Sequence, residues 1–145
     1  MKVFWLRYRF WINGFILLLP FWFLYQALTP PPLEPKWAKK QNGEFSAEVR
    51  PMDKEPPYLH DGEREKDFSV IFGDSCANRV KQAYLKVATS APNLPDDDSG
   101  IVHGNTSIQH AHVPFPDVIK TDDRLWLTIQ DWQGRIIQLS WVLEK

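Results

Sequence analysis

The C-terminal stretch RLWLTIQDWQGRIIQLSWVLE, residues 124–144, decides the fold of most of this chain. It divides around Trp132-Gln133-Gly134, where a glycine suits a turn that needs positive φ. On either side apolar and polar residues alternate, which is typical of strands with one buried face. The apolar positions are Leu125, Leu127 and Ile129 on the first arm and Ile137, Leu139 and Trp141 on the second. The stretch therefore predicts a β-hairpin that contributes both arms to the core.

The same two-residue period recurs upstream. Phe45, Ala47 and Val49 alternate with polar residues, and FSVIF at residues 68–72 ends at a Gly-Asp turn pair. Residues 80–89 also fit a helical stripe, but their β-branched and aromatic content favours a strand. We expect six or seven short strands in residues 42–145, arranged as a small antiparallel β-sandwich of immunoglobulin type. A partly open β-barrel is the alternative.

Two segments between these strands are expected to be long loops. Residues 51–66 are charged and rich in proline, and residues 90–100 contain an acidic run. Loops of this length are either mobile or used for contact.

Near the N-terminus, residues 10–28 read FWINGFILLLPFWFLYQAL and carry no formal charge. As a helix this stretch spans about 28 Å, close to the hydrocarbon thickness of a bilayer. A cleaved signal peptide would have the same basic start and apolar run, but no small-x-small cleavage motif precedes Thr29. We therefore predict a retained transmembrane helix.

The charges around this helix predict its direction. Residues 1–9 form a short head with Lys2, Arg7 and Arg9, and such a head is normally kept in the cytoplasm. The expected location is the inner (cytoplasmic) membrane, with a single pass and the C-terminal domain outside the cytoplasm, in the periplasm of a Gram-negative cell. Residues 29–41 contain four prolines and predict a stiff linker.

Composition excludes several classes of function. The chain carries 17 Lys and Arg against 18 Asp and Glu, so a basic nucleic-acid surface is not expected. There is no P-loop, nucleophile elbow or Gly-x-Gly-x-x-Gly sequence, and we predict that the protein is not an enzyme. Cys76 is the only cysteine, which rules out an internal disulfide and suits a small, half-buried side chain.

Histidines are the chemically informative residues. In a strand, His110 and His112 point to the same face, and His103 lies seven residues earlier, on an adjoining strand or turn. Two exposed or hydrogen-bonded histidines explain the pattern without a metal. The functional interpretation is a zinc or copper(II) site built from His103, His110 and His112.

The architecture resembles the FixH and YtkA-like families of membrane-anchored accessory proteins. The resemblance rests on one N-terminal span, a proline-rich exit and a β domain that ends in a strand pair, with GRIIQLSWVLE as the closest stretch. The tyrosine-rich segment that FixH-type proteins tend to carry after the span is missing, so no site residue is carried over. Because FixH-type proteins accompany respiratory oxidase and copper-transport assembly, the resemblance implies a role in envelope assembly.

Two functions follow as expectations. The first is a non-catalytic accessory protein or small subunit of a larger membrane complex, with membrane lipid and an integral membrane protein complex as its partners. The alternative is a periplasmic metal-binding module that uses its histidine face to hold copper or zinc.

Overall fold

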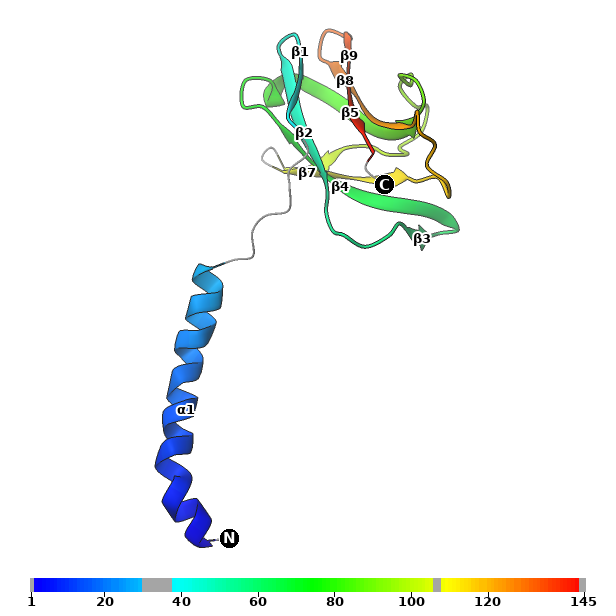
Figure 1. Cartoon of the computed structure of the whole chain (residues 1–145). Coiled ribbons are helices and arrows are strands. Elements are labelled where there is room, and N and C mark those ends of the chain that lie inside the picture. The colour runs from blue at the N-terminus through cyan, green and yellow to red at the C-terminus, as the bar shows by residue number, and fades with distance from the viewer. Residues whose placement is uncertain (1, 30–37, 106–107, 144–145) are drawn as a thin grey trace. The chain divides into compact units, whose positions relative to one another are not determined.

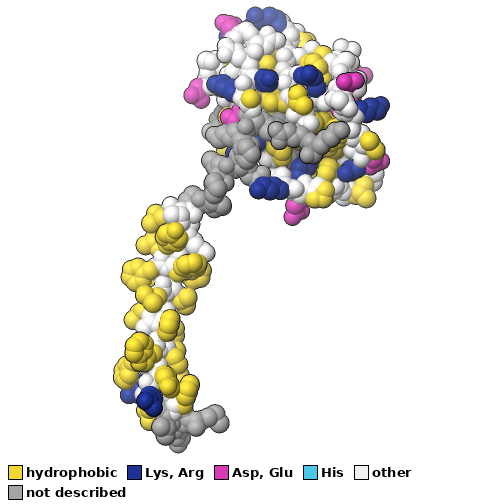
Figure 2. Space-filling model, in the orientation of Figure 1, with side chains coloured by type: hydrophobic (Ala, Val, Ile, Leu, Met, Phe, Trp, Pro, Cys, Tyr) yellow, Lys and Arg dark blue, Asp and Glu magenta, His cyan; other side chains and the backbone are white. Residues whose placement is uncertain are grey.

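The computed structural model describes residues 2–29, 38–105 and 108–143, and the chain divides into two units, Met1–Glu34 and Pro35–Lys145. The first unit is one helix, α1 (Lys2–Leu28). Among the described residues, its segment Phe4–Leu28 is the one helix long and apolar enough to cross a membrane. Exposed hydrophobic side chains run along α1 (Figure 2). A single N-terminal candidate membrane helix is therefore present.

The helix begins earlier than the apolar run does. We expected a head over residues 1–9 ahead of the span, and the backbone of this head is helical from Lys2 onward. Pro20 does not interrupt α1. Helix formation depends on backbone hydrogen bonds, and arginine and leucine are good helix formers, so α1 continues past the apolar stretch. The predicted linker, residues 29–41, lies for the most part outside the described residues.

The second unit is built from nine described strands in two antiparallel sheets (Figure 1). The strands are β1 (Lys40–Asn42), β2 (Phe45–Pro51), β3 (Tyr58–His60), β4 (Glu63–Phe72), β5 (Val80–Ala88), β6 (His103–Gly104), β7 (Gln109–Pro114), β8 (Arg124–Asp131) and β9 (Ile136–Val142). The larger sheet has the order β1-β2-β4-β7-β6, with β3 also paired to β4, and the smaller has the order β5-β8-β9. A 3-10 turn, Ala77–Arg79, leads into β5.

This strand order confirms the expected fold class. The path β2-β4-β7-β6 in one sheet and β5-β8-β9 in the other is the ABED and CFG order of a constant-type immunoglobulin sandwich. The sheets do not close into a barrel, which removes the alternative.

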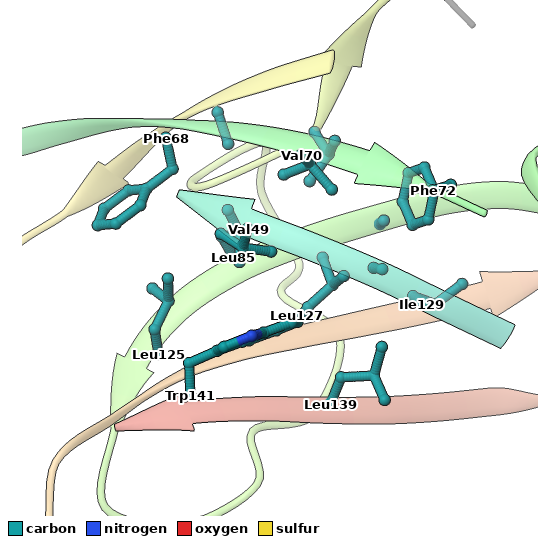
Figure 3. Packing of buried hydrophobic residues seen from close by; sticks show 14 of the residues in the cluster. Val49, Phe68, Val70, Phe72, Leu85, Leu125, Leu127, Ile129, Leu139 and Trp141 are labelled. Carbon is teal, nitrogen blue, oxygen red and sulfur yellow. The ribbon is translucent and has the colours of Figure 1, made fainter. Parts of the chain in front are cut away.

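The core lies between the two sheets, where the alternating apolar residues of each strand meet (Figure 3). The C-terminal hairpin contributes as predicted, because Leu125, Leu127 and Ile129 are fully buried. Trp141 lies opposite Leu125 in the β8–β9 register, and its indole Nε1 donates to the carbonyl of Ala38 at 2.6 Å.

The hairpin turn is held by one buried carboxylate. Gly134 has φ +82°, as the sequence predicted for this corner. Asp131 accepts hydrogen bonds from the backbone N–H of Gln133 at 3.0 Å and of Arg135 at 2.8 Å, and from Nε of Arg135 at 2.7 Å. These bonds close the turn without exposing the carboxylate.

The expected loop over residues 51–66 is wrong for its second half. Residues 58–60 form β3, which pairs with the start of β4 through a turn at Asp61 and Gly62, where φ is +48° and +88°. Asp-Gly is a strong signal for such a turn, but only three residues precede it in β3 and the residues that follow it are charged, so the flanks give no apolar alternation. Cys76 is also fully buried rather than half-buried. Residues 90–100 contain no strand, as expected.

Candidate metal site

The three predicted histidines meet on the outer face of the larger sheet, which is the face that points away from the core. In β7, Ala111 is fully buried, so the side chains of its neighbours His110 and His112 point outward. The pairing of β6 with β7 places His103 directly opposite His110. Both expectations, a shared face and an adjoining strand, are confirmed.

The rings lie close enough to share one ion. Ring centroids are 4.1 Å apart for His103 and His110, 5.7 Å for His103 and His112, and 6.0 Å for His110 and His112. One ring nitrogen from each residue lies within 4.8 Å of the other two. Tetrahedral zinc with Zn–N bonds near 2.05 Å needs nitrogens about 3.3 Å apart. Binding would therefore require the side chains to rotate, and the exposure of His103 and His112 and the partial exposure of His110 allow this.

Asp67 forms a hydrogen bond with the His112 ring. It lies on β4 as the cross-strand neighbour of His112, and its Oδ1 is 2.6 Å from Nδ1 of that histidine. Because a carboxylate can only accept, Nδ1 carries the hydrogen and Nε2 keeps its lone pair for a metal.

The same Asp67 oxygen accepts a second hydrogen bond, from the hydroxyl of Tyr58 on β3 at 2.9 Å. This hydrogen bond, together with burial and nearby carboxylates, raises the pKa of Tyr58. The hydroxyl therefore stays protonated and continues to donate.

His103 is oriented in the same way by backbone. Its Nδ1 lies 3.2 Å from the carbonyl oxygen of Ile101, which can only accept, so Nε2 is again the nitrogen with a lone pair. Metal-bound histidines commonly donate their second N–H to a carbonyl or carboxylate, and two of these three do so.

Gly104, the residue after His103, lies close to β7 and has a backbone conformation that favours glycine. Its φ of +131° lies where side chains are strained, and an added Cβ would lie 3.4 Å from Nδ1 of His110 and 3.2 Å from Cα of Gln109. Glycine after His103 therefore avoids backbone strain and a tight contact with β7 at the point where β6 pairs with it.

The other candidate groups do not join the site. Within the described residues, the triad is the one group of three or more histidine, cysteine or acidic side chains placed to hold a metal. His60 is exposed, and its Nε2 lies 3.7 Å from Oδ2 of Asp61, the next residue in the chain. The Cys76 thiol is buried and contacts the backbone of Ser46 and Gly73.

Asp67 and Tyr58 were missed by the sequence analysis. The run GEREKD at residues 62–67 has too many charges to show which of them faces a histidine. The signal that could have found Asp67 is the β4–β7 register, which cannot be derived from one sequence.

A family model, described as uncharacterised conserved protein UCP029505, matches residues 4–144. No curated protein and no solved structure matches the chain. The matched residues run from the apolar helix to the end of the last strand and include all three histidines. The chain therefore belongs to the UCP029505 family.

Proposed function

We propose that this protein is a membrane-anchored metal-binding module that holds one divalent ion, copper(II) or zinc, through His103, His110 and His112. The observation that carries the proposal is the convergence of one ring nitrogen from each histidine within 4.8 Å. Support comes from the Nδ1 contacts of His103 and His112, which leave Nε2 of both rings available.

The donor set favours these two metals. Neutral imidazole suits zinc and copper(II), and copper(II) binds nitrogen sites more tightly than zinc does. Copper(I) prefers thiolate and thioether ligands, whereas the Cys76 thiol is buried in the core at a distance from the outer face. Delivery or storage of a divalent ion is thus the better match.

The site also suits exchange of the ion. Three protein ligands leave a position for water or for a ligand from another protein, and two of the three rings are exposed. A bound ion is therefore reachable from solvent. This supports binding and transfer, and we propose no catalytic step.

A metal titration of the untagged full chain in detergent tests the proposal. We expect one copper(II) or zinc ion per chain, and loss of that ion in the double variant His110→Ala, His112→Ala. The matched control is His60→Ala, which removes an exposed histidine outside the cluster and should bind as the wild type does. Equal binding by the double variant and the control would reject the histidine site.

A second function is carried by the anchor. The side chains of Phe4–Leu28 are exposed along the whole helix, which suits a helix covered by lipid or by another membrane protein. We propose that α1 crosses the inner membrane with the β domain outside the cytoplasm, and that the protein is an accessory subunit of a larger membrane complex.

Replacing the span with an unrelated one separates the two functions. If α1 contacts a partner complex, the replacement weakens co-purification while the histidine variants leave it intact. If recovery of the complex is indifferent to the span, the accessory role through α1 is wrong.

A further inference from the structure

We propose that Asp67 is a positioning residue for the metal site and that Tyr58 holds it in place, so that a chain of hydrogen bonds across three strands sets the metal affinity. This inference rests on the proposed metal-binding function. Neither residue contacts the ion in the proposed site. Both act through the His112 ring.

The hydrogen-bond chain is short and continuous. The Tyr58 hydroxyl donates to Oδ1 of Asp67 at 2.9 Å, and the same oxygen lies 2.6 Å from Nδ1 of His112. Tyr58 is on β3, Asp67 on β4 and His112 on β7, and β4 pairs with both of the other strands. The three side chains are therefore linked by hydrogen bonds in the same order, β3-β4-β7, in which their strands are paired.

The Asp67 carboxylate is more shielded from water than an ordinary surface carboxylate. Its side chain is 23% exposed, whereas that of His112 is 49% exposed. A carboxylate in a partly desolvated position interacts more strongly with the N–H it accepts than one in water does. Two donors on one oxygen also fix the rotation of the carboxylate.

This arrangement has two consequences for a bound ion. The negative charge behind the ring makes Nε2 of His112 a stronger donor to a cation, and the Nδ1 bond fixes the ring plane. Loss of such a partner typically lowers metal affinity about 10- to 100-fold.

The β3–β4 hairpin brings Tyr58 to Asp67. The turn at Asp61 and Gly62 folds β3 back onto the start of β4, and the exposed strand β3 contributes no residue to the hydrophobic core. Its tyrosine reaches Asp67 nevertheless. A role in supporting the site accounts for a short exposed strand, β3, that core packing alone does not require.

The test compares copper(II) affinity of the untagged full chain with that of Asp67→Asn, by competition with a chelator of known affinity. Asparagine keeps the size of the side chain and removes the charge. We expect about 10- to 100-fold weaker binding, and a smaller loss for Tyr58→Phe. Glu63→Gln is the matched control, because it removes one negative charge from the same strand at an exposed position.

Two further readouts separate positioning from general stability. The electron paramagnetic resonance spectrum of bound copper should change in Asp67→Asn, since the negative charge behind the His112 ring is lost and Nε2 becomes a weaker donor to the ion. In a His112→Ala background, Asp67→Asn should cause no additional loss of affinity. Tyr58→Phe, a change on an exposed strand, keeps the test valid if Asp67→Asn folds poorly.

The outcomes distinguish this inference from the function on which it rests. If the wild type binds no ion, the proposed function fails. If the wild type binds and the histidine variants do not, while Asp67→Asn and Tyr58→Phe match Glu63→Gln in affinity and spectrum, the positioning role alone is overturned.

Discussion

Replacing Trp141 with alanine should destabilise the β-sandwich more than most single changes can. The side chain is 3% exposed and lies between the sheets against Leu125, its neighbour across β8 and β9 (Figure 3). Its truncation removes the largest buried side chain of the C-terminal hairpin and leaves a void that close-packed neighbours fill only in part.

The magnitude follows from burial. A buried tryptophan removes 150–250 Å² from water, and at about 25 cal/mol per Å² this is worth roughly 4 to 6 kcal/mol as an upper limit. The indole hydrogen bond to Ala38 adds little, because that carbonyl is on an exposed residue and can bond water instead. We expect a loss of about 3 to 5 kcal/mol for Trp141→Ala.

The assay is denaturant unfolding of a fragment that starts at Ala38, and circular dichroism of the β-sheet signal monitors the unfolding. This fragment retains the whole core cluster, which begins at Phe45. The matched control is Trp132→Ala, because Trp132 at the hairpin tip is 64% exposed and its loss should cost less than about 0.5 kcal/mol. Similar losses for the two variants, or a loss below about 1 kcal/mol for Trp141→Ala, would refute the proposed packing.

Three other predictions concern the turn, acid stability and topology. Gly134→Ala should cost about 1 to 2 kcal/mol through backbone strain alone, since φ is +82° and no atom lies within 4 Å of the added Cβ; a neutral result in the same unfolding assay would contradict this. Burial favours the neutral form of Asp131, yet the hydrogen bonds and charge of Arg135 hold the pKa of its carboxyl below the usual value. Its contribution is therefore complete above about pH 4 and is lost as the pH falls through the lowered value, so Asp131→Asn should flatten the acid limb of the stability profile, and an unchanged limb would argue against it. Alkaline phosphatase fused after Lys145 should be active and the chain should resist carbonate extraction; an inactive fusion would contradict the proposed orientation.

Period-two alternation was enough to predict the sandwich and much of the site. The C-terminal hairpin, with Leu125 and Trp141 on its buried face, follows from alternation and one glycine. The same rule places His110 and His112 on one face of a strand, because Ala111 between them takes the core side. These features depend on local sequence, which is why one sequence suffices for them.

What could not be predicted depends on pairing between distant segments. The contact of His112 with Asp67 joins residues 45 positions apart and requires the β4–β7 register. The β3–β4 hairpin was missed because β3 is only three exposed residues long and the start of β4 is charged, so that only the Asp61-Gly62 turn marks it. The start of α1 at Lys2 does not follow from the apolar run, because such a run indicates which residues suit lipid and not where backbone hydrogen bonding begins.

X-ray absorption spectroscopy of the untagged, zinc-loaded full chain tests the central claim most directly, because it reports the atoms bound to the ion. The structure predicts three imidazole nitrogens at about 2.0 to 2.1 Å and one oxygen from water. In the double variant His110→Ala, His112→Ala this signature should disappear. A shell of oxygen atoms alone, or one that contains sulfur from Cys76, would contradict a site formed by His103, His110 and His112.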